Sequence, residues 1–254
     1  MIAVRSFLFA VGALIWTGGL SILYLPLLVA PRHAIQRAAR FWIRGLMWWL
    51  AVTCGLRYRI EGGHHLPSGP VVVAAKHQSA WDTLIFHLVL PDPVFVLKRE
   101  LFRVPFLGWY LRKAGCVGVD RSAGYRALKE MVPAAERALA AGSQIVLFPE
   151  GTRTAPGRSR RYQPGIAVLD ADCGAAVVPA ALNSGVFWAR RSFRKSPGVI
   201  TLEFLPPMPK GLERRAFLAA LAERIETAAE RLRRRAIADG AVDNVSAGSL
   251  QSRE

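Results

Sequence analysis

Short apolar segments alternate with longer helical ones along most of this chain, and this alternation restricts the fold more than any other feature. We expect strands where short apolar runs lie between polar residues, at residues 57–61, 71–75, 94–97, 117–119, 145–148, 176–179 and 199–204. Helices are expected at residues 80–90, 123–141 and 212–236. Strands that alternate with helices predict an α/β fold with a mixed, mostly parallel sheet flanked by helices.

A histidine and an aspartate stand five residues apart directly after the apolar run 71–75. His77 and Asp82 can form a general base, because a carboxylate bound to one imidazole nitrogen leaves the other nitrogen free to take a proton. Residues five apart point to different faces of a continuous helix. We therefore expect His77 at a strand end or in a turn, and Asp82 in the first turn of the next helix. Taken alone, the pair also fits a buried histidine satisfied by a nearby acid.

A second polar block follows the strand expected at 145–148 and reads Pro149-Glu150-Gly151-Thr152-Arg153. The glycine permits a tight turn, and the guanidinium of the arginine is a planar fork suited to phosphate. Alone, this block is a loop with a local Glu–Arg pair. The order of the two blocks, with the His–Asp pair first, is more specific than either block alone.

Four blocks together resemble the 1-acylglycerol-3-phosphate (lysophosphatidate) acyltransferases of the glycerolipid acyltransferase superfamily. Besides the two polar blocks, they are residues 98–121, with Lys-Arg-Glu-Leu, Pro-Phe-Leu-Gly-Trp and Gly-Cys-Val-Gly-Val-Asp-Arg, and residues 177–183, Val-Val-Pro-Ala-Ala-Leu-Asn. The resemblance covers about residues 57–210. Two departures stand out. Many members of the family have Phe where this chain has Gly118, and many have a Lys-Lys-Gly-type stretch where residues 161–165 read Arg-Tyr-Gln-Pro-Gly.

The resemblance implies that an acyl group passes from an acyl thioester to the free hydroxyl of 1-acylglycerol-3-phosphate, making phosphatidate for phospholipid synthesis. His77 would be the base and Asp82 its holder. The substrate-binding residues would be Lys98, Arg121, Glu150, Gly151, Thr152 and Arg153, with Arg153 and Lys98 first and Arg121 third for the phosphate. Glu150 either contacts substrate, orients Arg153 or caps the loop. Ser79 lacks a Gly-x-Ser-x-Gly elbow, so direct transfer in a ternary complex is expected.

No metal site and no resident cofactor is expected, because the donor, acyl-CoA or acyl-carrier protein, is a co-substrate. The His–Asp pair has no Cys/His set nearby in the sequence, and His64-His65 fit a polar loop before the turn at 67–70. The chain has three cysteines, an odd number without zinc-type spacing, which indicates a reducing compartment.

The N-terminal segment is expected to associate with a membrane. Residues 6–31 carry no charge and would span a bilayer, which needs about 20 apolar residues. A signal peptide is the competing interpretation, but the run is long and no small-x-small cleavage site follows it. Residues 45–56 are too short to span and fit an interfacial or re-entrant helix. One spanning helix or a helical pair dipping into one leaflet both remain open, and the resemblance favours the pair.

Three regions are therefore expected along the chain. Residues 1–56 would form membrane-anchoring helices, residues 57–236 the acyltransferase domain, and residues 237–254, which are small and polar, a disordered tail. The basic residues between 32 and 44 place the side after Pro31 in the cytoplasm, so the predicted location is the cytoplasmic face of the inner (plasma) membrane.

The net charge of +16 suggests an anionic partner. Nucleic acid would need a recognition motif, and the sequence has none, so it is not expected as a partner. Anionic membrane lipids fit better, since each basic residue near such a surface contributes about 1 kcal/mol. The densest clusters are Arg190, Arg191, Arg194 and Lys195, and then Arg231, Arg233, Arg234 and Arg235. The second cluster is on the helix at 212–236, whose apolar side also fits packing on the domain.

Two rival functions remain. The first is an acyltransferase of the same family with another lyso-acceptor, such as a lyso-ornithine lipid, because residues 161–165 depart from the family pattern. The second is a catalytically silent, membrane-associated binding protein. The intact His77–Asp82 pair argues against the second, because a binding module has no need of a base. The sequence carries no signature of acyl-chain length, donor type or oligomeric state.

Overall fold

Seven strands form one mixed sheet in the computed structural model, which describes residues 1–120 and 123–241. They are β1 (Leu56–Glu61), β2 (Val71–Ala75), β3 (Pro93–Lys98), β4 (Val117–Val119), β5 (Gln144–Leu147), β6 (Ala176–Leu182) and β7 (Gly198–Phe204). The order across the sheet is β1-β7-β6-β2-β5-β3-β4. Every neighbouring pair is parallel except β6 and β7. The predicted α/β fold with a mostly parallel sheet is confirmed, and each expected strand is present.

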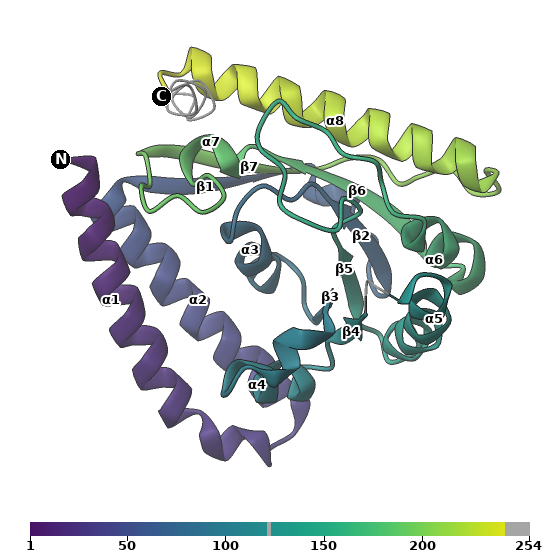
Figure 1. Ribbon diagram of the computed structural model, residues 1–254, viewed down its shortest axis with the longest axis horizontal. Helices are drawn as coiled ribbons and strands as arrows, with labels where there is room; N and C mark the ends of the chain where they lie inside the picture. Colours follow the sequence, from purple (N-terminus) through teal and green to yellow (C-terminus); the bar gives the residue numbers. More distant parts are fainter. Residues whose placement is uncertain (121–122, 242–254) are drawn as a thin grey trace.

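Helices cover both faces of this sheet (Figure 1). On one face, α2 (Arg32–Cys54) and α3 (Trp81–Val89) pack on the odd-numbered residues of β2. On the other face, α5 (Tyr125–Ala140), α6 (Gly165–Cys173) and α8 (Arg214–Ala238) pack on its even-numbered residues. All five residues of β2 are buried, which explains why this central strand is an uninterrupted apolar run rather than an alternating one.

The three helices expected in the domain are present as α3, α5 and α8. Short helical segments were not predicted, namely η1 (Leu25–Leu28), η2 (Gly63–His65), η3 (Arg99–Arg103), α4 (Leu107–Lys113), α6 and α7 (Ser184–Phe187). Pro164 directly precedes α6. Proline is compatible with a helix start, because its missing N–H has no partner there in any case.

The N-terminal segment is a hairpin of two long helices, α1 (Ile2–Leu23) and α2 (Figure 1). Glycines let tryptophans of the opposite helix pack closely. A Cβ at Gly12 would overlap the Trp49 ring, and one at Gly45 would overlap Trp16. Within the described residues, α1 is the one helix long and apolar enough to cross a membrane.

The prediction for residues 32–56 was wrong in one respect. Residues 45–56 do not form a short helix of their own, since residues 45–54 are the second half of α2 and the basic residues at 32–44 lie in its first half. Buried residues continue through the charged half, including Ile35, Ala38 and Ile43. The first half of α2 is therefore amphipathic, with basic residues around a core-facing stripe, whereas the second half exposes the apolar side chains of Trp48 and Val52.

The three-region division stays a prediction. Helix α2 ends at Gly55, which is left-handed, and β1 begins one residue later, next to the predicted boundary. Ile43 and Leu50 of α2 are buried in the same core as β2 and α3. Of the tail expected at 237–254, residues 237 and 238 complete α8. Residues 242–254 lie outside the described residues.

Candidate active site

The carboxyl ends of parallel strands bring the predicted site residues to one edge of the sheet. Strand β2 is parallel to β5 and β6, and β5 is parallel to β3. His77 follows β2, the loop with Arg153 follows β5, Ser184 follows β6, and Lys98 ends β3. Ligands of open α/β sheets bind at this edge, so the fold supports one site rather than scattered motifs.

His77 and Asp82 contact each other as their spacing predicted. His77 lies between β2 and α3, and Asp82 is in the first turn of α3. The His77 Nδ1 to Asp82 Oδ2 distance is 2.9 Å. The imidazole stacks on Phe148 with ring centroids 4.0 Å apart. The His77 side chain is 14% exposed, and within the described residues its Nε2 has no hydrogen-bond partner, so this nitrogen is available to a substrate.

Asp82 is fully buried, and protein donors satisfy its carboxylate. Besides His77, Oδ2 accepts the backbone N–H groups of Gln78 at 2.6 Å and Ser79 at 2.8 Å. Oδ1 accepts the Ser184 hydroxyl at 2.5 Å. Because both backbone groups can only donate, they fix which carboxylate oxygen faces the imidazole.

The Pro149–Arg153 block and the adjacent Thr154 form a loop that holds the His77 backbone on both sides. Gly151 has a positive φ of 69°, which accounts for the glycine in this turn. Glu150 Oε2 accepts the His77 backbone N–H at 3.2 Å, and the Thr154 N–H donates to the His77 carbonyl at 2.8 Å. The loop and the base are therefore fixed to each other through main-chain groups. Thr152 lies in this loop and is partly exposed.

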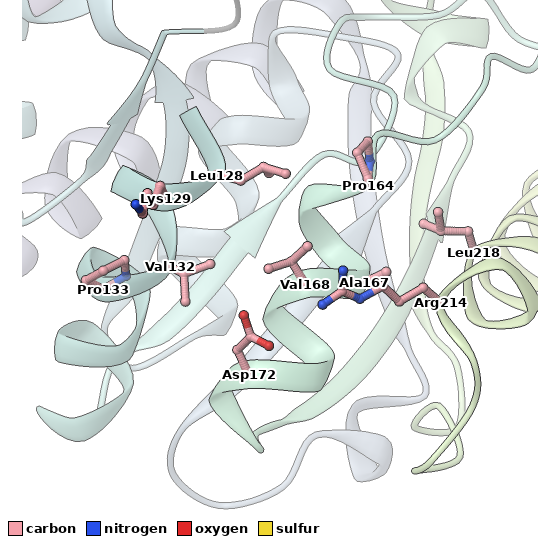
Figure 2. Close-up of a pocket in the computed structure, with 10 residues that line it drawn as sticks. All are labelled: Leu128, Lys129, Val132, Pro133, Pro164, Ala167, Val168, Asp172, Arg214 and Leu218. Atoms are coloured by element: carbon pink, nitrogen blue, oxygen red, sulfur yellow. The ribbon is translucent and has the colours of Figure 1, made fainter. Parts of the chain in front are cut away.

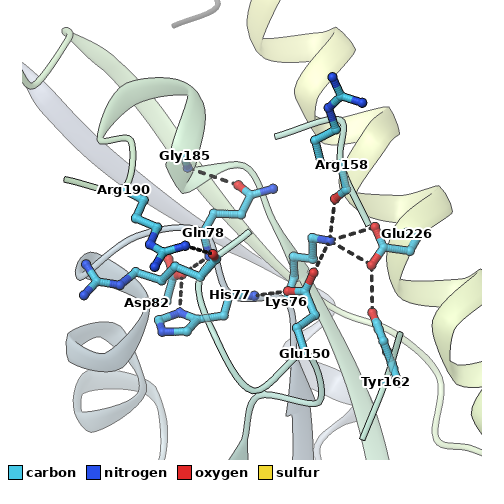
Figure 3. Close-up of polar contacts among 11 residues, drawn as sticks. Lys76, His77, Gln78, Asp82, Glu150, Arg158, Tyr162, Gly185, Arg190 and Glu226 are labelled. Atoms are coloured by element: carbon cyan, nitrogen blue, oxygen red, sulfur yellow. Dashed lines mark hydrogen bonds and ion pairs between the residues drawn. The ribbon is translucent and has the colours of Figure 1, made fainter. Parts of the chain in front are cut away.

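A buried lysine pairs with Glu150, and sequence reasoning missed it. Lys76 Nζ lies 2.7 Å from Glu150 Oε1 and 2.8 Å from both carboxylate oxygens of Glu226 on α8 (Figure 3). Glu150 therefore does not orient Arg153 through an ion pair. A lysine directly after a five-residue buried strand was the available signal, because a buried ammonium requires acidic partners.

The predicted phosphate-binding cations have different surroundings. Within the described residues, the Arg153 guanidinium has no hydrogen-bond or ion-pair partner, and its carbonyl accepts Arg190 Nη1 at 3.2 Å. Lys98 is exposed and pairs with Glu100 at 3.1 Å. No hydrogen bond or ion pair among the described residues links Lys98 to the His77–Arg153 group. Arg121 lies outside the described residues.

Both departures from the family pattern have a structural counterpart. The Phe102 ring occupies the space that a Cβ at Gly118 would enter, so an aromatic ring from η3 covers this strand residue. In the 161–165 stretch, Tyr162 is buried and donates to Glu226 Oε1 at 2.9 Å. The stretch therefore contributes to the polar cluster around Lys76.

The side chains of the two basic clusters are less free to contact lipid than their sequences suggest. Lys195 is only 6% exposed, and its ammonium lies over the rings of Phe9, Trp188 and Phe193 at 4.9–5.3 Å. Desolvation lowers its pKa. The expectation that Lys195 faces lipid is therefore wrong, because Phe9, far away in the sequence, and the nearby Trp188 and Phe193 surround its ammonium. On α8, the second cluster is largely paired with Glu61, Glu203 and Glu230.

A cavity of about 360 Å³ opens between α5, α6 and α8, lined by Leu128, Val132, Val168 and Leu218 among others (Figure 2). It contains no predicted site residue. Within the described part of the chain, no group of three or more His, Cys, Asp or Glu side chains could hold a metal ion.

The site thus combines a His–Asp pair at the carboxyl edge of the sheet with a loop that carries an arginine. Residues 57–183 match the family model described as Acyltransferase, so the chain belongs to the acyltransferase family. Its branch is that of the 1-acyl-sn-glycerol-3-phosphate acyltransferases. The chain is 34% identical over 229 residues to the protein of this name from Pseudomonas aeruginosa, covering 88% of each chain.

Further relatives agree with this assignment. The 1-acyl-sn-glycerol-3-phosphate acyltransferase alpha of Ovis aries is 32% identical over 174 residues, which are 67% of this chain and 61% of that one. The crystal structure of the 1-acyl-sn-glycerophosphate (LPA) acyltransferase PlsC from Thermotoga maritima superimposes with a TM-score of 0.71, covering 91% of this chain and 95% of that one. At 23% sequence identity, this likeness establishes the shared fold.

Proposed function

We propose that this protein transfers an acyl group from an acyl thioester to the free hydroxyl of 1-acylglycerol-3-phosphate, producing phosphatidate. The observation that carries the proposal is the His77–Asp82 pair at 2.9 Å, with Nε2 open and the Arg153 loop fixed to the same histidine. The similarity to the Pseudomonas aeruginosa protein of that name over 88% of this chain supports the choice of substrate.

The reaction follows from the position of the imidazole proton. Asp82 accepts a hydrogen bond from Nδ1–H, so the lone pair of Nε2 can take the proton of the acceptor hydroxyl as its oxygen attacks the thioester carbonyl carbon. The buried carboxylate stabilises the imidazolium that forms. When the tetrahedral intermediate collapses, the C–S bond breaks, and the imidazolium can return its proton to the leaving thiolate. No covalent acyl-enzyme and no metal is needed for this sequence of steps.

Arg153 is our first choice for the phosphate of the acceptor, because its guanidinium is uncommitted and its loop contacts His77. Lys98 and Arg121 are second and third choices, with Gly151 and Thr152 as the turn that presents Arg153. Glu150 would act through Lys76 and His77 rather than by touching substrate. The donor is acyl-CoA or acyl-carrier protein, as a co-substrate and not a resident cofactor.

The acceptor is an amphiphile of the bilayer, so the site must work at a membrane surface. Helix α1 exposes large apolar side chains, including Leu14 and Ile15, and anchors the protein in this proposal. The basic residues Arg190, Arg191 and Arg194 would face anionic lipid on the cytoplasmic side of the plasma membrane.

The test uses purified membranes that contain either the wild-type protein or His77→Ala. With acyl-CoA and lysophosphatidate, the wild type should form phosphatidate, and the variant should lose about 10²–10⁴-fold in rate. Parallel reactions with lyso-ornithine lipid test the rival acceptor. Replacing acyl-CoA with acyl-carrier protein that carries the same acyl group shows which donor is used. Wild-type turnover by His77→Ala would refute the catalytic assignment, and inactivity of the wild type on every acceptor would favour a binding protein.

A further inference from the structure

A buried lysine beside the catalytic base takes no part in the proton transfer. Lys76 directly precedes His77, and its side chain is 1% exposed. Its ammonium donates to Glu150 at 2.7 Å, to the Arg158 carbonyl at 3.0 Å, and to both carboxylate oxygens of Glu226 at 2.8 Å. The end of β2, the loop after β5 and helix α8 therefore meet at one cation (Figure 3).

The lysine acts on the base through Glu150. One oxygen of this carboxylate is bound by Lys76, and the other accepts the His77 backbone N–H at 3.2 Å. The Thr154 N–H holds the His77 carbonyl from the opposite side. Arg153 lies between these two attachment points. The same hydrogen bonds therefore fix the position of its backbone relative to His77.

The same cluster fixes the rest of the loop to α8. Glu226 accepts the Tyr162 hydroxyl at 2.9 Å, while Lys76 holds the Arg158 carbonyl. The loop is thus held near its start at Glu150, in its middle at Arg158 and near its end at Tyr162. Burial and then the Glu226 carboxylate raise the pKa of Tyr162, which keeps its hydroxyl protonated as a donor.

We propose that Lys76 and Glu226 are positioning residues that set the distance between the base and the phosphate-binding arginine. Neither residue touches substrate. Their effect passes through Glu150 to His77 and through the loop to Arg153. Their loss should therefore weaken binding of the acceptor, because its hydroxyl must lie at His77 while its phosphate lies at Arg153. The proposal rests on the function proposed above and adds α8, which lies outside the matched family region of residues 57–183, to the determinants of acceptor binding.

Glu226 is the place to test this, because Lys76→Met would leave the buried Glu150 without its cation and is expected to unfold the protein. We compare Glu226→Gln, which keeps an acceptor for Lys76, with Glu226→Leu, which removes it. The matched control is Arg231→Gln on the same helix, since Arg231 forms an exposed ion pair with Glu203. The measurements are the KM for each substrate, kcat, the melting temperature, and hydrogen exchange of residues 149–163 in the full-length protein.

Glu226→Leu should raise the KM for lysophosphatidate about 10-fold, the size expected for losing a buried hydrogen bond to a charged group. The KM for acyl-CoA should stay within about twofold, and exchange of residues 149–163 should accelerate. Glu226→Gln should be intermediate, and Arg231→Gln should behave as wild type. These results together would support the positioning role.

An unchanged acceptor KM with unchanged loop exchange would overturn the proposal. So would equal losses for both substrates that follow the fall in melting temperature, because that pattern describes a purely structural role. The measurement of hydrogen exchange does not depend on enzymatic activity. If the wild type fails to use lysophosphatidate, the proposed function fails, while faster or unaltered exchange in Glu226→Leu still decides whether the cluster holds the loop.

Discussion

Asp82 accepts four hydrogen bonds, and two of them come from backbone N–H groups that cannot reverse their direction. This detail changes what an amide at the position would do. In Asp82→Asn the side-chain oxygen should remain toward the backbone donors and the imidazole, with its NH2 toward Ser184, whose hydroxyl can turn to accept. We therefore do not expect the asparagine to favour the wrong tautomer of His77. The main defect should be the loss of the negative charge that stabilises the imidazolium.

We predict that Asp82→Asn lowers kcat by at least about 10²-fold, because the imidazolium loses its carboxylate partner. Ser184→Ala removes one of the four donors and keeps the charge, so its loss should be smaller, about 10-fold or less. Steady-state kinetics with a saturating acceptor measures both. Equal loss in the two variants would show that orientation outweighs charge.

Arg153→Ala should raise the KM for lysophosphatidate about 10-fold or more, and leave the KM for the acyl thioester little changed. A charge-assisted contact to phosphate contributes on the order of 1.5–3 kcal/mol. Lys98→Ala should act in the same direction more weakly, because its ammonium is exposed and already has Glu100 as a partner. Equal effects on both substrates would instead point to a structural role for the loop.

His87 should make the fold sensitive to acid. Burial lowers its pKa to about 4, and the nearby guanidinium of Arg40 adds to this effect. Its Nδ1 is buried and has no partner among the described residues. The unfolded chain takes up this proton near pH 6.5, whereas the folded one resists until about pH 4. The contribution of neutral His87 to the free energy of unfolding is therefore fully present above pH 6.5 and is lost as the pH falls toward 4.

Replacing this imidazole tests the assignment. The melting temperature of His87→Leu should fall less between pH 7 and pH 5 than that of the wild type, since each pKa unit corresponds to about 1.4 kcal/mol. His64→Leu serves as the control, because that ring is exposed. An identical pH dependence in the His87 variant would assign the acid sensitivity to other groups.

At the scale of elements, local sequence patterns predicted all seven strands and the domain helices α3, α5 and α8. Buried strands are marked by apolar runs and long helices by periodicity, and both signals are local. Helices α4 and α7 have only seven and four residues, too few turns for a periodic signal, and α6 begins directly after Pro164, a residue typical of loops. The His–Asp contact was predictable because it spans five residues, whereas Lys76 meets Glu226 across 150 residues.

The segment between α7 and β7 shows the same limit. Lys195 looked like part of an exposed basic cluster, yet its neighbours include Phe9 and Ser6 of α1. Phe9 also packs edge-on against Trp188, with ring centroids 5.6 Å apart. The Trp188 N–H bonds the carbonyl of Ser184, the residue that donates to Asp82. Helix α1 thus packs on the segment that supports the His77–Asp82 pair.

Lys195→Ala should therefore lower the melting temperature by several degrees, because a large buried side chain is lost. It should leave binding to anionic vesicles unchanged. The triple substitution of Arg190, Arg191 and Arg194 by Ala should do the reverse, with weaker binding to anionic than to neutral vesicles. Vesicle sedimentation and thermal unfolding distinguish the two. Weakened vesicle binding by Lys195→Ala alone would mean that this side chain reaches lipid after all.

On the scale of the whole molecule, α1 and α2 differ in what they contact. Helix α1 leaves Leu14 and Ile15 mostly exposed, whereas α2 buries Ile43 and Leu50 in the domain core. Removing everything before β1 would therefore destroy the core and remove α1 at the same time. A deletion that ends before Arg32 separates the two effects, because it keeps α2 and the ion pair between Arg32 and Asp92.

We predict that high salt or carbonate does not release the full-length protein from membranes, since apolar insertion rather than charge supplies most of its affinity. Deletion of residues 1–31 should move much of the protein to the soluble or aggregated fraction and reduce activity on bilayer-embedded acceptor. Fractionation with immunoblotting measures this. If the deleted protein stays in the membrane fraction with full turnover, another surface is the anchor.

The partners of α1 also set an order of events during synthesis. The Ser6 hydroxyl accepts the backbone N–H of Lys195, 189 residues later in the chain, and β1 pairs with the last strand, β7. At 5–20 residues per second, the ribosome needs on the order of 10–40 s to bridge that interval. Throughout this delay the nascent helix can pack on α2 but lacks its contacts with the segment around Lys195, and the bilayer is the other apolar environment at hand. We expect the chain to reach the membrane before its catalytic sheet can close, so that folding is completed on the surface where the enzyme works.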